Sequence, residues 1–144
     1  MSDLNQHPLI LNYVQANQFG TFLGMEFRII EPGIVSYELS VKEDHLATPH
    51  SAHGGAIAAL MDAVVGVGAL SLVCVEDKVV STIEMKISFL RPVNLNDKLR
   101  GVSDVVKAGK RILFMDGKIL NQKDELVAVA SATLNAYPKE KAGY

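Results

Sequence analysis

The chain has 144 residues, of which 49% are hydrophobic, and a formal net charge of −2 at pH 7. This length predicts one domain, residues 1–144, that is large enough to bury a core. The near-neutral charge argues against nucleic acid and anionic membrane surfaces as partners. The single cysteine, Cys74, excludes an intramolecular disulfide. Together with an N-terminus that lacks a secretory signal pattern, it predicts a cytoplasmic location.

The N-terminal part of the chain is expected to form a helix followed by a hairpin. Residues Pro8–Phe19 carry apolar side chains at helical spacing, and Gly20 is a stop signal for that helix. Met25–Ile30 and Ile34–Val41 alternate in the manner of strands, and the Pro-Gly step between them predicts a turn.

The middle of the chain contains its most apolar segment. A polar loop, Lys42–Ala52, precedes an expected helix over Gly54–Val73. Asp62 is the only charge between Ala56 and Val75. A segment of this length and composition could cross a bilayer, but no cluster of Lys or Arg flanks it. We therefore interpret it as a core helix, in which an isolated carboxylate is costly unless it is paired or functional.

The C-terminal half is expected to consist of successive strands with period-two alternation. These are Val79–Leu90, Lys98–Val106, Arg111–Leu120 and Leu126–Tyr137. The order of helix, hairpin, long helix and four strands predicts an α+β fold. In this fold a curved antiparallel sheet is wrapped around one long central helix.

Three motifs point to a family. A His-Gly-Gly step, His53–Gly55, is followed by an acid, Asp62, nine residues after the histidine, and the next strand ends in Phe89–Pro92. The chain thereby resembles the hot-dog-fold acyl-CoA thioesterases, most closely the phenylacetic-acid-degradation and 4-hydroxybenzoyl-CoA thioesterase type. The resemblance implies hydrolysis of an acyl-coenzyme A thioester without metal or cofactor. It also implies a homodimer with shared active sites, or a homotetramer of such dimers.

The residues themselves suggest the same chemistry. Asp62 can attack a thioester carbonyl or take a proton from water. Backbone N–H groups at the helix start, where Gly54 and Gly55 permit close approach, can bind the developing oxyanion. The nine residues from His53 to Asp62 span roughly 13.5 Å of helix. One helix therefore cannot present both groups to one carbonyl, and two antiparallel helices of a dimer could.

The resemblance also assigns roles residue by residue. Gly54 matches the oxyanion-binding position, Asp62 the catalytic carboxylate, and Thr82 a hydroxyl that holds water or the carboxylate. His53 matches a histidine that supports the helix start rather than a base. Six residues before His53, the Asn or Gln of the family is replaced by Ala47.

Two further side chains are candidates for contacts with the substrate. His50, or the neighbouring Thr48, could supply the polar group that is missing at Ala47. Arg91, directly after the long strand, is a candidate for binding the phosphates of coenzyme A.

Several other interpretations compete with the thioesterase. The spacing His50-x-x-His53 suggests a metal site, but no third ligand accompanies it. Ser51 beside these histidines suggests a Ser-His-Asp triad, but no G-x-S-x-G elbow exists. A hydratase or dehydratase of the same fold usually has its acid elsewhere. A non-catalytic protein that binds an acyl or aryl-CoA would explain the departure at Ala47.

Overall fold

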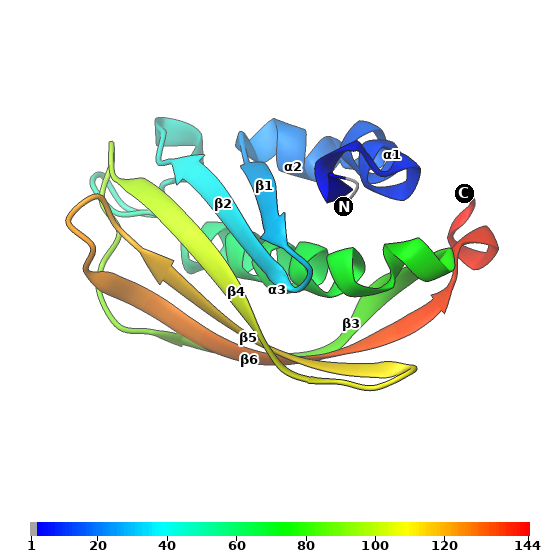
Figure 1. Ribbon diagram of the computed structural model, residues 1–144. Coiled ribbons are helices and arrows are strands. Elements are labelled where there is room, and N and C mark those ends of the chain that lie inside the picture. Colours follow the sequence, from blue (N-terminus) through cyan, green and yellow to red (C-terminus); the bar gives the residue numbers. More distant parts are fainter. Residues whose placement is uncertain (1–2) are drawn as a thin grey trace.

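The computed structural model describes residues 3–144 (Figure 1). Its α-helices are α1 (Pro8–Ala16), α2 (Gln18–Leu23) and α3 (Gly54–Val73). Short 3-10 helices are η1 (Leu4–Gln6), η2 (Glu43–His45), η3 (Cys74–Glu76) and η4 (Lys139–Ala142). The strands are β1 (Glu26–Glu31), β2 (Ile34–Ser40), β3 (Lys78–Phe89), β4 (Lys98–Ala108), β5 (Ile112–Leu120) and β6 (Leu126–Pro138).

The strands form one antiparallel sheet in the order β1-β2-β4-β5-β6-β3. The sheet curves, and α3 runs along its concave side, with α1 and α2 on the other side of α3 (Figure 1). The predicted α+β fold is confirmed, and each strand lies within two residues of its predicted bounds. Strand β3 pairs with β6 instead of with its successor β4, so that β3 forms one edge of the sheet.

The prediction of a single N-terminal helix over Pro8–Phe19 is wrong. Residues expected to form one helix ending before Gly20 form two helices that meet at Asn17. The Asn17 side chain accepts a hydrogen bond from the Gly20 N–H at 3.0 Å and so caps the start of α2. Gly20 lies inside α2, and the helix ends at Gly24, whose φ of 80° is the left-handed conformation that glycine favours.

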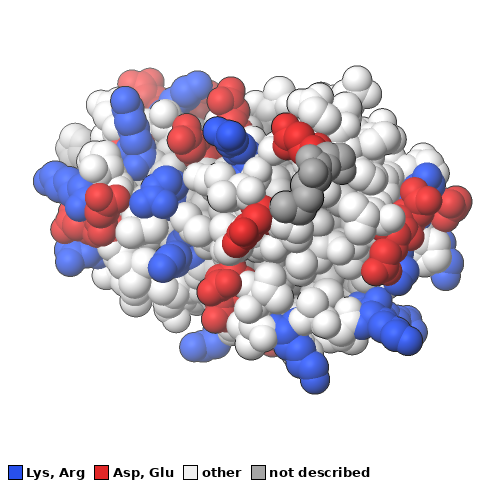
Figure 2. Space-filling model, in the orientation of Figure 1, with Lys and Arg blue, Asp and Glu red and all other residues white. Residues whose placement is uncertain are grey.

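Helix α3 has the predicted bounds and provides much of the core. Leu60, Met61 and Val64 are fully buried between α3 and the sheet. With η3, the helix is long and apolar enough to cross a membrane, and 67% of its most apolar window is buried inside the protein. On the face shown in Figure 2, Lys and Arg side chains are interspersed with Asp and Glu side chains rather than gathered in one patch.

Buried serines hold the turn between β1 and β2. The Gly33 carbonyl accepts a hydrogen bond from the Ser103 hydroxyl at 2.8 Å, and the same hydroxyl accepts one from the Val35 N–H at 3.0 Å. The Gly33 N–H donates to the hydroxyl of Ser71 on α3 at 2.8 Å. Ser103 and Ser71 are each 1% exposed, so their hydroxyls replace water as partners of the buried turn.

We expect Ser103→Ala to lower the free energy of unfolding by about 1–3 kcal/mol, because it leaves a buried carbonyl and a buried N–H without partners. Urea denaturation followed by circular dichroism would measure the change. The control is Ser131→Ala on β6, an exposed position, for which a change within about 0.5 kcal/mol is expected. Equal effects of the two substitutions would contradict the proposed role of Ser103.

Candidate active site

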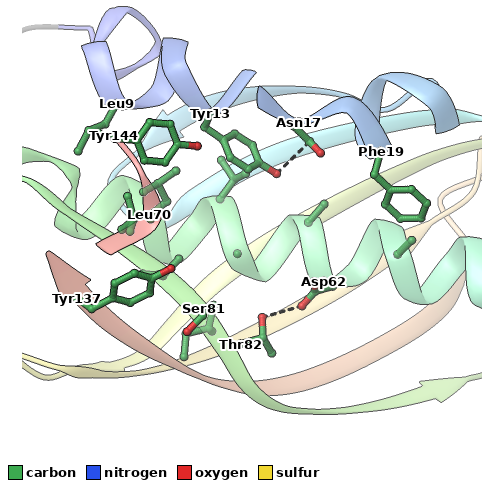
Figure 3. A pocket seen from close by; sticks show the side chains of 18 of the residues that line it. Leu9, Tyr13, Asn17, Phe19, Asp62, Leu70, Ser81, Thr82, Tyr137 and Tyr144 are labelled. Atoms are coloured by element: carbon green, nitrogen blue, oxygen red, sulfur yellow. Dashed lines mark hydrogen bonds between the residues drawn. The ribbon is translucent and has the colours of Figure 1, made fainter. Parts of the chain in front are cut away.

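Asp62 and Thr82 form the polar centre of the candidate site. The Thr82 hydroxyl on β3 donates a hydrogen bond of 2.7 Å to Asp62 Oδ1 on α3 (Figure 3). Asp62 Oδ2 has no hydrogen-bond partner within residues 3–144. The structure thus brings together two of the residues predicted to be catalytic, and leaves one carboxylate oxygen available to water or substrate.

Asp62 is exposed, which corrects the expectation of a helix buried on all sides. Gly55, Asp62 and Gly66 lie on one face of α3 and are exposed or partly exposed, whereas Leu60 and Val64 are buried. The charge on Asp62 therefore bears no large desolvation cost in the single chain. Its position is explained by the open face of α3 rather than by burial.

A β-bulge directs Thr82 toward the helix. Thr82 pairs with Leu134 of β6, Met85 pairs with Ala132, and the register shifts at Ile83. Leu134 and Ala132 are buried on the concave face, and opposite residues of antiparallel strands share a face. The extra residue at Ile83 therefore allows Thr82 and Met85 to face α3 although their spacing is odd.

The Asp62–Thr82 pair lines a pocket of about 410 Å³. Its walls come from α1, α2, α3, β3 and the C-terminal end of the chain (Figure 3). Apart from the pair, the lining is mostly apolar or aromatic; it includes Leu9, Tyr13, Phe19, Met25, Val67, Leu70, Val79, Val80, Leu134, Tyr137 and Tyr144. Such a pocket can hold an apolar group next to a carboxylate.

The start of α3 offers a hydrogen-bond donor. His53 is the N-cap residue, and its Nδ1 accepts the Gly55 N–H at 2.7 Å. A Cβ at Gly55 would lie 2.8 Å from that Nδ1, so the cap requires glycine there. The Gly55 N–H is thus already engaged, and the Gly54 N–H has no partner in the described part of the chain. The role expected of His53, support of the helix start, agrees with this cap.

Gly54 and Asp62 belong to different pockets. Gly54 lines a pocket of about 330 Å³ together with Phe89 and Arg91. Asp62 lines the larger pocket described above, further along the helix. The single chain therefore does not bring the free N–H and the carboxylate to one point, in agreement with the distance expected along the helix.

The remaining predicted substrate-binding residues are exposed. The Arg91 guanidinium forms an ion pair with Glu125 at 3.2 Å at the edge of the smaller pocket. His50 lies in the loop before α3 and lines neither pocket. The Thr48 hydroxyl accepts the Ser51 N–H at 3.0 Å and so stabilises its own loop. No group of three potential metal-ligating side chains is found among residues 3–144.

Sequence reasoning missed the contribution of the N-terminal helices to the site. Tyr13 and Asn17 line the Asp62 pocket and are joined by a hydrogen bond (Figure 3). The segment from Leu4 to Met25 contains no Asp, Glu, Lys or Arg. The absence of charged residues from this helical segment could have indicated that it covers a pocket. It does not show which face of the helices, or which side chains, line that pocket.

Comparison with known proteins agrees with this architecture. The family model "Thioesterase superfamily" matches residues 50–128. The curated "Putative esterase F42H10.6" of Caenorhabditis elegans is 31% identical over 106 residues, which cover 72% of this chain and 60% of that protein. Human "Acyl-coenzyme A thioesterase 13" is 28% identical over 92 residues, 63% of this chain and 64% of that protein. The matched regions thus span less than two-thirds of these relatives.

Solved structures share the fold over most of the chain. The E. coli PaaI protein of the phenylacetic acid degradation operon superposes with a TM-score of 0.84 at 21% identity, covering 94% of each chain. The smu.793 protein of Streptococcus mutans, solved with bound acetyl CoA, has a TM-score of 0.74 at 26% identity, covering 81% of this chain and 91% of that one. With its curved sheet around α3, the chain belongs to the thioesterase superfamily and has the hot-dog fold of the PaaI type.

Proposed function

We propose that this protein hydrolyses acyl-CoA thioesters to the free acid and CoA, with Asp62 as nucleophile or general base. The observation that carries the proposal is the Asp62–Thr82 hydrogen bond beside an apolar pocket. Thr82 occupies Oδ1 and fixes the orientation of the carboxylate, so that Oδ2 is directed at a bound ligand or water. Family membership and the acetyl CoA bound to the smu.793 protein support an acyl-CoA as the substrate.

The oxyanion is bound by the Gly54 N–H of a second protomer. Strand β3 is an edge strand of 12 residues, and Ile83 and Phe89 on it are 57% and 52% exposed. A long edge of this kind tends to pair with another chain. Antiparallel pairing of two β3 strands continues the sheet across the dimer and sets the two α3 helices antiparallel. In that arrangement the start of one helix approaches Asp62 of the other.

Two mechanisms fit the geometry. In the first, Asp62 takes a proton from water, and the resulting hydroxide attacks the thioester carbonyl. In the second, Asp62 attacks the carbonyl itself, and water then hydrolyses the mixed anhydride by attack at the Asp62 carboxyl carbon. In both, the Gly54 N–H stabilises the negative oxygen of the tetrahedral intermediate, which collapses with release of the CoA thiolate. Single turnover in ¹⁸O-labelled water separates them, because only the second mechanism places the label in Asp62.

Arg91 is proposed to bind a phosphate of CoA. It lies beside Gly54 at the edge of the smaller pocket, and its guanidinium is 54% exposed. The ion pair with Glu125 is exposed and therefore weak enough to be exchanged for a phosphate contact.

A second candidate is a protein that binds acyl-CoA without hydrolysing it. Ala47 favours this candidate, because the family resemblance places an Asn or Gln there and an alanine side chain cannot hydrogen-bond to water or to the carbonyl. The exposed loop around Ala47 supplies no side-chain hydrogen bond to Asp62 or Thr82.

The test is release of free CoA from a panel that runs from acetyl-CoA to dodecanoyl-CoA and includes benzoyl- and phenylacetyl-CoA. We expect turnover of at least one thioester with a kcat/KM of about 10⁴ M⁻¹s⁻¹ or more. Calorimetric titration with the same compounds is run in parallel. Binding without CoA release would support the second candidate, and neither binding nor release would exclude both.

A further inference from the structure

The pocket has a second polar group, across from Asp62 and Thr82. Figure 3 shows Tyr13 on α1 and Asn17 at the junction of α1 and α2 on the wall opposite that pair. Both side chains are partly buried. The thioesterase mechanism proposed above does not use either of them.

The orientation of the Asn17 amide is fixed by the helix that it caps. Its Oδ1 accepts a hydrogen bond from the Gly20 N–H at 3.0 Å. Only the oxygen of the amide can accept this bond, because the nitrogen is a donor. The Nδ2 group is therefore turned toward α1, where it donates to the Tyr13 hydroxyl at 3.1 Å. One of the two acceptor positions on the Tyr13 oxygen is thus occupied.

The hydroxyl of Tyr37 is a second neighbour of the Tyr13 hydroxyl. Tyr37 lies on β2 and is 1% exposed, and the ring of Phe27 packs against both tyrosines, with centroid distances of 6.1 Å to Tyr13 and 5.1 Å to Tyr37. Burial raises the pKa of Tyr37, and the hydrogen bond with Tyr13 raises it further. For Tyr13, burial also raises the pKa, but the same hydrogen bond lowers it. The buried Tyr37 proton needs an acceptor, whereas the Tyr13 proton can reach the pocket, so Tyr37 is assigned as the donor and Tyr13 as the acceptor.

The Tyr13 proton is consequently left for a ligand. A phenol oxygen has two acceptor positions and one proton, and both acceptor positions are used. Among residues 3–144 no group accepts a hydrogen bond from the Tyr13 hydroxyl. Since Tyr13 lines the pocket, its proton is available to a group bound there.

We propose that Tyr13 is a specificity-determining residue that donates a hydrogen bond to an oxygen atom carried by the acyl group, away from the thioester. The pocket wall also includes the apolar side chains of Leu9, Val67 and Leu70, and the ring of Tyr144 lies beside Tyr13 (Figure 3). The preferred acyl group is therefore a largely apolar one with an acceptor oxygen within reach of Tyr13. This inference rests on the proposed thioesterase function and adds the class of acyl group to it.

The test compares hexanoyl-CoA with hydroxyhexanoyl-CoA isomers that carry the hydroxyl on successive carbons. For the wild type, we expect the kcat/KM of one isomer to exceed the kcat/KM of hexanoyl-CoA and of each other isomer by about fivefold to tenfold. Tyr13→Phe should abolish this preference, because it removes the proton and keeps the ring. A selectivity ratio is insensitive to a general loss of active protein, so partial unfolding of a variant does not imitate the effect.

Two further variants sharpen the comparison. Asn17→Asp keeps an oxygen to cap α2 but replaces the Nδ2 donor with an acceptor. The Tyr13 hydroxyl would then donate its proton to this acceptor instead of to the ligand, so the preference should also be lost. Tyr137→Phe removes another hydroxyl from the same pocket and should retain the preference. No preference in the wild type, or an unchanged ratio in Tyr13→Phe, would overturn the proposal.

Binding measurements separate this inference from the proposed function. Dissociation constants for the same isomers are measured by calorimetry in the Asp62→Asn background, with and without Tyr13→Phe. If no thioester is hydrolysed but the binding preference depends on Tyr13, the function fails and the specificity role stands. If thioesters are hydrolysed without a Tyr13-dependent ratio in rate or binding, the function stands and the specificity role fails.

Discussion

Replacing Asp62 with Asn is expected to lower kcat for thioester hydrolysis about 10²–10⁴-fold, which is the usual contribution of a general base. The loss is larger if Asp62 is the nucleophile. The amide oxygen still accepts the hydrogen bond that Thr82 now donates to Oδ1 at 2.7 Å, so the local geometry is retained. An amide neither takes a proton from water nor attacks a carbonyl. Initial rates of CoA release and a thermal melt of the same preparation would separate loss of chemistry from loss of fold.

The matched control is Asp116→Asn. Asp116 is an exposed carboxylate on β5 that lines a groove away from the Asp62 pocket. Its replacement removes the same charge from the protein, and kcat should stay within about twofold of wild type if distant charges have little effect. An Asp62→Asn variant that turns over like this control would exclude Asp62 as the catalytic group.

The second large effect is expected at the start of α3. Gly54→Pro removes the N–H that is proposed to bind the oxyanion, and proline is favoured at the first position of a helix. The preceding residue, His53, has φ −65° and ψ 134°, which are compatible with a following proline. We expect kcat to fall about 10²–10³-fold, as for loss of one oxyanion donor.

Gly54→Ala is the control for this substitution. It retains the N–H, and the added Cβ would lie 3.7 Å from the ring of Phe89, an ordinary contact. Its loss of activity should be much smaller than that of Gly54→Pro. Equal losses would show that the space at Gly54, rather than its N–H, matters.

The shared site predicts complementation between two inactive variants. In a mixed dimer of Asp62→Asn with Gly54→Pro, one of the two sites combines an intact carboxylate with an intact N–H. The purified mixed dimer should then have about half of the wild-type activity, and a randomly assorted mixture before purification about a quarter. Co-expression with two different affinity tags, followed by tandem purification of the mixed dimer, provides the measurement. No recovery in a stable mixed dimer would contradict a site composed of residues from two protomers.

The regular parts of this structure were predictable because they depend on local patterns. The apolar run that forms α3 and the alternation in β4, β5 and β6 specify the elements and their bounds. Support of the helix start by His53 was implied by the family resemblance, and in the structure the ring accepts the N–H of the second glycine.

The less regular features depend on long-range contacts that periodicity does not reveal. The break at Asn17 depends on a side chain that caps a second helix in preference to continuing the first. The exposure of Asp62 could not be foreseen, because an apolar composition does not show which face of α3 the sheet leaves uncovered. The contribution of Tyr13 to the pocket was missed for the same reason, since Tyr13 and Asp62 are far apart in sequence and line one pocket only after folding. Thr82, by contrast, is indicated by the family resemblance.

The bulge at Ile83 reconciles the odd spacing of its neighbours with a shared face of the sheet. In a regular ladder of the same length, either the Thr82 hydroxyl or the Met85 side chain would turn outward, away from α3. Deleting Ile83 would remove the bulge and the odd spacing together, so both side chains would still face α3. The side chain at Ile83 itself is 57% exposed and can vary in chemistry. Evolution of this lineage should therefore tolerate substitution or loss of this residue, and should eliminate changes that straighten the strand without shortening it.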